Sequence, residues 1–475
     1  MTALYVALAA VGFIAFLVAQ PKVKALISFF LMMQFFDMAP NLMFGMYVWD
    51  YGAILMLVTA VDVFLRIPVT PTPSHAFLTV LKVFLVWLVI CLLWSLAVYG
   101  YPLMHTIKNA RYLVLGYLMT LIFVRLFAVQ PDSFEFLMKW FYRLTFVLMP
   151  LVVLQYFLGR PLLSGLVSDY EGEIRAVPVF MPFCLLNFWI ICTKALSAAK
   201  VRMHEWIYTV LVLATVGLSF TRGIYISVML TAGLLVWALL RDKTLKASSL
   251  VLVAAAGLLL LLGVFASGAA DKVSGRVLSG FELLGSPDST LEGKKKGDTF
   301  NGRLGLAAER FSLVWEKNPL IGYGFIHEDD VPSELRSRLR FGTVLGGTAA
   351  DPTAYSRSYE FTSHYVLGFY TADIAWADII ISTGWVGVAL FGTFMVTFVV
   401  GHFRRRSGVD AAGYAIANGL FLQVVTMFLL TVDGNNFYTA VHIPAFILAG
   451  YAFTQAAAVP CYAREPKMAF PNLMA

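Results

Sequence analysis

The sequence predicts an all-α, polytopic integral membrane protein with about 13 transmembrane helices (roughly 12 to 14). Three observations carry this prediction. Of the 475 residues, 60% are hydrophobic and 13% are charged, whereas about a quarter of the residues in soluble domains are charged. Apolar runs near the ~20 residues needed to cross a bilayer recur from Leu4 to Ala458. Lys and Arg cluster in alternate loops between these runs, which is the pattern that orients membrane helices.

The apolar runs mark the expected helices in order along the chain. We expect spans near residues 3–19, 24–44, 48–65, 77–99, 112–129, 134–158, 177–196, 205–220, 223–240, 248–268, 374–402, 411–432 and 437–458. No basic segment precedes the first run and no clear cleavage site follows it, so we expect this helix to be retained.

The basic residues between the spans predict which helix ends face the cytoplasm. Alternate loops carry Lys22 and Lys24, then Arg66, Arg125, Lys194 with Lys200 and Arg202, Arg241 with Lys243 and Lys246, Arg404 to Arg406, and finally Arg464 with Lys467. Those loops are expected inside, which places the amino terminus outside and the carboxyl terminus inside. The net charge of +7 is explained by this orientation, and we assign no nucleic-acid partner.

One long hydrophilic stretch, residues 269–373, interrupts the hydrophobic pattern and is expected on the outer side. The chain therefore divides into a bundle of about ten helices at 1–268, the outer loop at 269–373, and carboxyl-terminal helices with a tail at 374–475. A structureless connection of that length would be unusual, which indicates function. Within it, residues 303–317 predict an amphipathic helix that presents Leu304, Ala307, Phe311 and Val314 and ends at Asn318-Pro319. A second short helix is expected over 332–340.

Positive charge on the outer side is the first candidate for chemistry, because the orientation rule makes it scarce there. The residues concerned are Lys108, Arg111, Arg160, Arg175, Arg222 and Arg303. Any one of them alone is more simply a lipid headgroup contact. Arg222 is the sharpest case, since Thr221-Arg222-Gly223 is expected to form a tight turn between two apolar helices. The planar guanidinium is suited to phosphate oxygens. The run Lys294 to Lys296 is read as a solvated loop tip.

Acidic and imidazole groups provide the candidate proton acceptors. His364, His327 and Glu360 stand in the loop without a partner at a recognisable spacing. Asp62 and Asp378 fall inside spans, where a carboxylate needs a partner. The four cysteines, Cys91, Cys184, Cys192 and Cys461, show neither a disulfide framework nor metal-ligand spacing. We expect no metal and no cofactor.

Three patches in one order resemble the bacterial O-antigen ligase and polysaccharide polymerase superfamily (Wzy/WaaL-like). The first is the Ser219 to Gly223 turn, SFTRG. The second is Gly302-Arg303, a helix, and then Pro319-Leu320-Ile321-Gly322-Tyr323-Gly324. The third is Ala372-Asp373 followed by an apolar run with Thr383, Gly384 and Gly387. The resemblance is strongest over 205–400 and implies a GT-C-like membrane glycosyltransferase of the bacterial inner (cytoplasmic) membrane, multi-pass, with its active site facing the periplasm.

One departure from the ligase pattern favours a polymerase. Ligases of this family commonly carry His-Asn where this chain has Ala372-Asp373, eleven residues before Gly384. The Ala-Asp pair resembles the one seen in many capsule and exopolysaccharide polymerases. The resemblance therefore implies polymerisation of undecaprenyl-diphosphate-linked oligosaccharide repeat units into O-antigen, capsule or exopolysaccharide.

The implied reaction is metal-independent, inverting glycosyl transfer. Arg222 and Arg303 are expected to bind the diphosphate leaving group, assisted by Arg111 and Arg175, because fixed cations stabilise its growing charge. Asp373 is the expected general base, and His364 and Glu360 are second candidates. The implied partners are the lipid-linked oligosaccharide, the bilayer, a chain-length regulator and a flippase.

Two other functions stay open at this point. A ligase would transfer the glycan to lipid A core or to protein, and differs only in the acceptor. A transporter of lipid-linked oligosaccharide is a distant alternative, because such proteins usually show repeated halves and short loops, which this sequence lacks. Covalent chain extension by pure protein separates a polymerase from a transporter.

Overall fold

The computed structural model describes sixteen segments of the chain, and the fold is given for these residues. They are 13–33, 42–43, 46–65, 75–158, 162–163, 165–170, 173–197, 200–219, 221–242, 244–245, 298–339, 344–345, 366–370, 374–404, 411–432 and 441–457.

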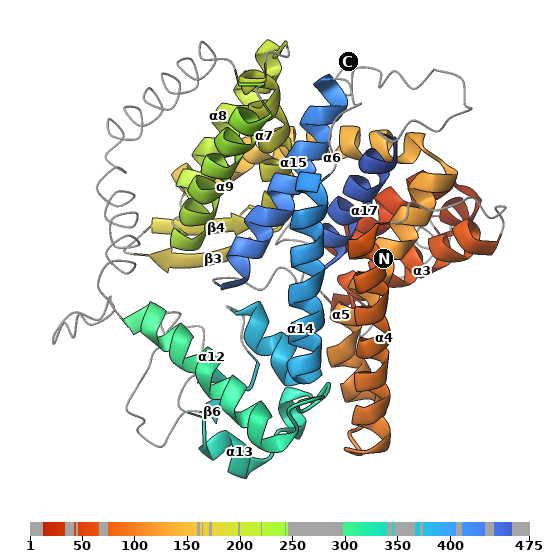
Figure 1. The fold of residues 1–475 in the computed structure, drawn as a ribbon, viewed down its shortest axis with the longest axis vertical. Coiled ribbons are helices and arrows are strands. Elements are labelled where there is room, and N and C mark those ends of the chain that lie inside the picture. The colour runs from red at the N-terminus through yellow and green to blue at the C-terminus, as the bar shows by residue number, and fades with distance from the viewer. Residues whose placement is uncertain are drawn as a thin grey trace.

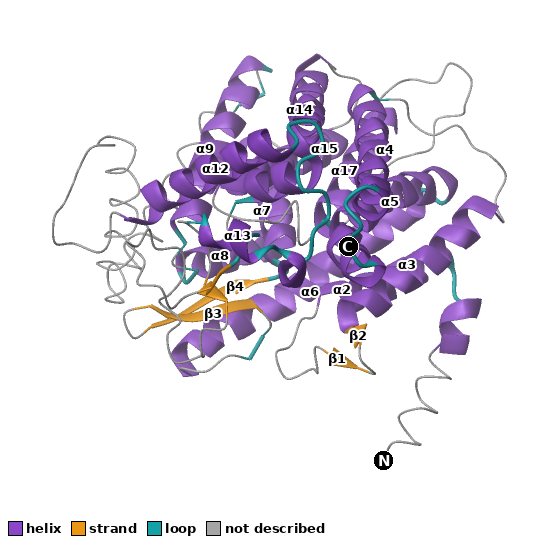
Figure 2. Cartoon of the chain, turned by 90° about the horizontal axis from the view of Figure 1, so that it is seen from below, coloured by secondary structure: helices purple, strands orange, loops and turns teal. Residues whose placement is uncertain are grey.

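The chain is an all-α polytopic membrane protein, as the sequence predicts (Figures 1 and 2). Its long helices are α2 (Pro21–Met33), α3 (Val48–Leu65), α4 (Ala76–Ala97), α5 (Leu103–Val129), α6 (Asp132–Leu158), α7 (Met181–Leu196), α8 (Met203–Gly217), α9 (Arg222–Arg241), α12 (Asp298–Lys317), α14 (Ala375–Arg404), α15 (Ala411–Leu429) and α17 (His442–Ala457). Short helices are η1 (Glu328–Asp330), α13 (Ser333–Ser337) and η3 (Leu430–Val432).

Three small antiparallel hairpins accompany the helices. They pair β1 (Leu42–Met43) with β2 (Met46–Tyr47), β3 (Gly165–Tyr170) with β4 (Glu173–Pro178), and β5 (Val344–Leu345) with β6 (Val366–Leu367). In the longest, Gly165 lies opposite Pro178 and Tyr170 lies opposite Glu173. This hairpin occupies the start of the span expected at 177–196, so the helix α7 begins only at Met181, with Pro182 in its first turn.

Seven helices in the described segments are long and apolar enough to cross a membrane, namely α3, α4, α5, α6, α9, α14 and α15. Helix α7 is a shorter apolar helix. The span expected at 248–268 and most of the one at 3–19 lie outside the described residues, so the total of about 13 stays a prediction.

Two expected boundaries were wrong. Helix α5 begins at Leu103 and not near 112. The polar residues of its first turns form hydrogen bonds with the outer-loop segment, so they can be part of the helix. Helix α2 ends at Met33 and not near 44. In contrast, α12 ends at Lys317 as expected. Pro319 cannot continue the helix, and the Asn318 side chain accepts hydrogen bonds from the backbone N–H groups of Leu320 and Ile321.

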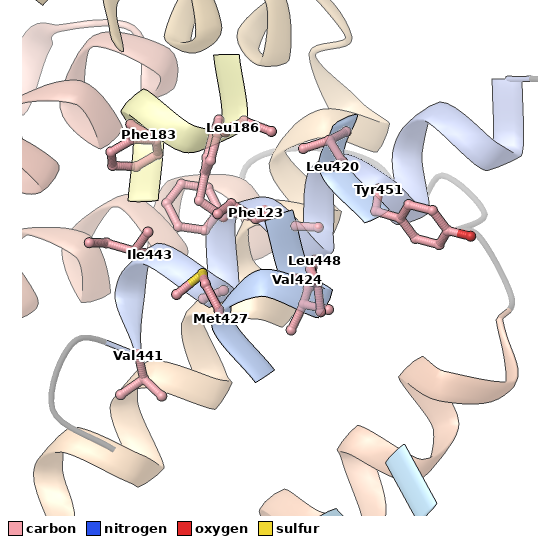
Figure 3. Close-up of a cluster of buried hydrophobic side chains, with 14 of the residues drawn as sticks. Phe123, Phe183, Leu186, Leu420, Val424, Met427, Val441, Ile443, Leu448 and Tyr451 are labelled. Carbon is pink, nitrogen blue, oxygen red and sulfur yellow. The ribbon is translucent and has the colours of Figure 1, made fainter. Parts of the chain in front are cut away.

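The hydrophobic core lies where the last helices of the chain enter among the early ones. Figure 3 shows Phe123 of α5, Phe183 of α7 and Leu420 of α15 around residues of α17 such as Leu448. The Phe446 ring contacts six phenylalanine rings from four other helices, those of Phe29, Phe123, Phe127, Phe134, Phe141 and Phe183. His75, just before α4, has its Nε2 2.9 Å from the Ala452 carbonyl oxygen, 377 residues later.

Ion pairs join helix ends that the alternation of basic loops assigns to one side. Lys24 of α2 is paired with Asp62 of α3, and both side chains are buried. This confirms that Asp62 has a partner inside the bundle. Lys194 at the end of α7 lies 2.9 Å from Glu205 at the start of α8. Arg241, at the end of α9, donates to the Phe403 carbonyl near the end of α14.

The helices α12 and α13 and the strand β6 gather at one end of the molecule, beside the adjoining ends of α4 and α14 (Figure 1). We call this the α12 end. The residues that resemble the family patches at 302–324 and 374–387 lie there, so the candidate site is built at this end.

Candidate functional site

The turn after α12 and a kink in α14 are joined by backbone hydrogen bonds. The Tyr323 N–H donates to the Ile381 carbonyl at 2.8 Å, and the Trp385 N–H donates to the Pro319 carbonyl at 2.8 Å. The kink is at Gly384, whose φ of 64° and ψ of −167° interrupt the helix. We call the turn 318–324 together with 381–385 the glycine joint. It brings the second and third family-like patches into direct contact.

Glycine is required on both sides of this joint. A Cβ on Gly384, which has a φ of +64°, would lie 2.2 Å from the Leu320 carbonyl oxygen. A Cβ on Gly322, at a φ of +74°, would lie 2.5 Å from the Ile381 carbonyl oxygen. Both positive φ angles and both close approaches disfavour any side chain. The two segments can therefore approach this closely only as backbone against backbone.

Helix α4 fixes the joint to the transmembrane bundle. The Trp87 indole N–H donates to the Thr383 carbonyl at 2.9 Å. At the end of the helix, the Tyr99 hydroxyl donates to the Gly322 carbonyl at 2.8 Å. The Ser95 hydroxyl accepts from the Phe325 N–H, also at 2.8 Å. One helix thus binds both halves of the joint.

A second network holds the segment 366–370, which precedes Asp373 in the chain. Arg310 of α12 is fully buried and donates to the carbonyls of Phe369, at 2.9 Å, and Gly368, at 3.1 Å. Burial lowers the pKa of Arg310, and the carboxylates of Glu309, Asp378 and Glu328 oppose this shift. The guanidinium remains charged, because the pKa of arginine is far above neutral.

Glu328 and Arg336 complete this network from the other side. The Glu328 carboxylate accepts from the N–H groups of Phe369, at 3.0 Å, and Tyr370, at 2.7 Å. Arg336 pairs with Glu328 at 3.3 Å and donates to the Leu367 carbonyl at 2.9 Å. These bonds fix the backbone of the segment 366–370 against α12 and η1.

The packing of α12 against α14 brings the first half of α12 to the start of α14. Leu306 of α12 and Ile374 pack in one buried cluster with Ala377 and Trp376. Arg303 lies three residues before Leu306 in α12, so its backbone is about one helical turn away from this cluster. Ile374 follows Asp373 directly, and consecutive Cα atoms are about 3.8 Å apart. The helical turn that carries Arg303 thus adjoins the residue after Asp373.

The start of α9, which carries Arg222, reaches the same region. Thr231 of α9 bonds Thr426 of α15 at 3.0 Å, and Tyr414 at the start of α15 bonds Asp242 after α9 at 2.9 Å. The two helices are therefore antiparallel, which puts the start of α9 at the η3 end of α15. Helix η3 contacts both α9 and α14, and its Thr431 accepts from the Trp376 indole at 2.8 Å. Trp376 of α14 thus packs beside α12 and bonds to η3, and η3 contacts α9.

The expected turn at Arg222 differs in detail from the observed one. Leu218 and Ser219 lie in a turn after α8, and Arg222 is already the first residue of α9. The Thr221 hydroxyl donates to the Ser219 carbonyl at 2.9 Å, and the Tyr225 hydroxyl donates to the Gly217 carbonyl at 2.6 Å. These bonds occupy carbonyls near the end of α8. The turn thus ends at Thr221, two residues earlier than expected.

The remaining predicted residues are placed less completely. Arg111 of α5 is paired with Asp50 at 2.8 Å and donates to the Tyr112 hydroxyl at 2.8 Å, so a diphosphate would compete with Asp50 for it. Arg175 lies in β4 opposite Ser168. The side chains of Arg175, Arg222 and Arg303 lie outside the described part of the structure, as do the whole residues Glu360, His364 and Asp373.

Sequence reasoning missed Arg310 and misread His327. The most buried side chains of α12 are Leu306, Arg310, Leu313 and Val314. Of the expected residues, Val314 is thus fully buried, whereas Ala307 and Phe311 are only partly buried. The sequence did contain a signal for the burial of Arg310, because Arg310 lies at helical spacing from the buried apolar residues of α12. His327 was interpreted as having no partner, yet its ring lies 4.8 Å from that of His105. No sequence pattern could have joined residues so far apart in the chain.

The comparison with protein families bears on this same region. Residues 207–392 match the family model described as O-antigen ligase, Wzy_C. The match contains all three patches quoted for the resemblance, and it confirms that resemblance over these residues. No curated protein matches the chain.

Proposed function

We propose that this chain polymerises undecaprenyl-diphosphate-linked oligosaccharide repeat units at the periplasmic face of a bacterial inner membrane. The family match supports an O-antigen ligase or polymerase function in general. The observation that supports the site is the packing around Trp376 at the start of α14: the first half of α12 packs beside it, and its indole bonds to η3, which in turn contacts α9.

The proposed chemistry uses the residues that these segments carry. The acceptor hydroxyl oxygen attacks the anomeric carbon of the donor sugar, from the face opposite the diphosphate. The carbon–oxygen bond to the diphosphate breaks, and the electron pair leaves on the diphosphate. Arg222 and Arg303 stabilise that growing charge, with Arg111 and Arg175 as outer contacts. Asp373 accepts the hydroxyl proton, and the configuration inverts in one step.

A ligase is the second candidate, and the match to the O-antigen ligase family favours it. The two functions share the donor and differ in the acceptor. We expect the pure, reconstituted protein to extend a lipid-linked repeat unit into longer lipid-linked chains without any other acceptor. A product that forms only when lipid A core is added would identify a ligase. If neither product forms although the donor is bound, the glycosyl-transfer proposal fails.

Replacing the proposed diphosphate ligands tests their role. Arg222→Lys and Arg303→Lys keep the charge but lose the planar fork. We expect each to lower turnover about ten-fold or more, which corresponds to about 1.4 kcal/mol of transition-state stabilisation. Arg404→Lys, at the exposed end of α14, is the matched control and should keep the parent rate. If both variants polymerise as fast as this control, neither arginine binds the diphosphate in the transition state.

The orientation of the outer loop is tested by thiol labelling. In a Cys461→Ser background, a cysteine at Gly293 should react with a membrane-impermeant maleimide added to intact spheroplasts. A cysteine at Ser407, beside the basic run after α14, should react only after the membrane is opened. Labelling of Ser407→Cys but not Gly293→Cys in intact spheroplasts would exclude a periplasmic site.

The proposed reaction also assigns a role to each part of the chain and implies two protein partners. Residues 269–373 would form the periplasmic segment, between the bundle of 1–268 and the helices of 374–475. The substrate must be carried across the membrane before it reaches that side, which is why we include a flippase among the partners. A chain-length regulator would act on the same elongating product.

A further inference from the structure

Two histidines and two aspartates, none of them assigned a role in glycosyl transfer, meet where α5 begins. His105 lies in the first turn of α5, and His327 directly precedes η1, which contains Asp329 and Asp330. The imidazole rings of His105 and His327 are 4.8 Å apart between centroids and tilted by 31°. Imidazole and carboxylate are the ligand types that bind zinc and similar transition-metal ions.

The ligand atoms are spaced almost as a metal ion requires. One atom each from His105, His327 and Asp329 lies within 4.8 Å of the other two. The Nδ1 of His327 and the Oδ2 of Asp329 are 3.2 Å apart. Ligands of a tetrahedral zinc ion with bonds near 2.0 to 2.1 Å are about 3.3 Å from one another. That pair is at ligand distance, but His327 Nδ1 accepts a hydrogen bond from the Asp329 N–H at 3.3 Å, which an ion would replace. His105 has to approach by about 1.5 Å.

Asp330 holds His105 in the tautomer that can bind a metal ion through Nε2. Its carboxylate oxygens lie 2.9 and 3.0 Å from His105 Nδ1, which therefore carries the proton and donates it. The lone pair is then on Nε2. A carboxylate bonded to the far nitrogen is the usual outer partner of a metal-binding histidine, because it fixes both tautomer and ring orientation.

Charge and exposure also suit an ion at this position. Lys108 lies near His327 and acts on it electrostatically. The two carboxylates outweigh the single positive charge of Lys108. The Asp329 side chain is 73% exposed, so an ion can enter from solvent and a water molecule can complete the coordination.

We propose that His105, His327 and Asp329 bind one divalent transition-metal ion, of which zinc is the best fit, with Asp330 orienting His105. The ion is a structural tie, and no bond of the transfer reaction passes through it. It links α5 to the loop that follows the glycine joint. Asn109, one turn further along α5, donates to the Ile326 carbonyl and to the Tyr370 hydroxyl, both at 2.7 Å, and so extends the same link.

Metal content of the purified protein tests this site without any activity measurement. The full chain, purified without a histidine tag, is stripped with EDTA, incubated with zinc chloride, freed of excess metal and analysed by elemental mass spectrometry. We expect about one zinc per chain, and its loss in the double variant His105→Ala with His327→Ala. His204→Ala, a histidine in the first turn of α8, is the matched control and should retain zinc.

A second variant guards against misfolding of the double variant. Asp329 is largely exposed, so Asp329→Asn should fold normally and bind zinc at least ten-fold more weakly. Zinc, but not magnesium, should raise the melting temperature of the parent and of His204→Ala, and leave the double variant unchanged. Equal zinc content in the parent, the double variant and Asp329→Asn would mean adventitious binding and would overturn the proposal. Absence of zinc from the parent would overturn it as well.

Discussion

Gly384→Ala should leave little folded protein at temperatures where the parent is intact. The φ and ψ of Gly384, 64° and −167°, lie in a region that is essentially restricted to glycine. Forcing another residue into such a conformation costs about 1 to 3 kcal/mol. The new methyl group would also lie 2.2 Å from the Leu320 carbonyl oxygen. The glycine joint would have to open and lose two backbone hydrogen bonds, each worth about 1 kcal/mol.

Alanine substitutions elsewhere in α14 provide the control for this prediction. A Cβ at Gly392 or Gly401 meets no atom within 4 Å. Gly392→Ala and Gly401→Ala should therefore melt at or slightly above the temperature of the parent, since alanine favours the helix. Melting in detergent, followed by fluorescence and size-exclusion chromatography, measures all three. If Gly384→Ala melts together with these controls, the kink does not depend on glycine.

Asp373→Asn should fold and bind the lipid-linked donor, yet lose most of its turnover. A positioned group that accepts a proton in the transition state typically contributes 10² to 10⁴ in rate. Asparagine keeps the size of the side chain but cannot take the proton. Single-turnover extension of a labelled repeat unit measures the rate, and donor binding is measured separately.

The competing role for Asp373 is a cap at the start of α14. Asparagine caps a helix as well as aspartate does, so a capping role predicts unchanged stability and unchanged turnover. Activity of Asp373→Asn within two-fold of the parent would therefore exclude Asp373 as the base. Glu360 and His364 would then be the residues to test as proton acceptors.

The sequence predicted those features that depend on local pattern. The apolar runs located the spanning helices, and Asn318-Pro319 located the end of α12, because each signal acts within a few residues. Asp62 was expected to need a partner from its burial alone, and the partner is Lys24. The family patches were recognised one by one, without any indication that 319–324 and 383–385 contact each other.

Features that depend on contacts between residues far apart in the chain could not be predicted from the sequence. The face of α12 that is buried is set by α14 and by the segment 366–370, which select Arg310 over Phe311 for the interior. The hydrophobicity of the helix alone cannot choose between two such faces. The contact between His105 and His327 likewise joins residues that are far apart in the chain.

The late entry of α17 into the core has a consequence for biosynthesis. His75 meets Ala452 across 377 residues of chain, and a ribosome that adds about 5 to 20 residues per second needs roughly 20 to 75 s to make that stretch. During this interval, α4 and α5 reside in the lipid without the helix that will cover them. The nascent bundle must therefore be held open by lipid or by an insertion factor until Phe446 arrives to close it. Substitutions on α17 should then lower the yield of inserted protein more than they lower the stability of molecules that have already assembled.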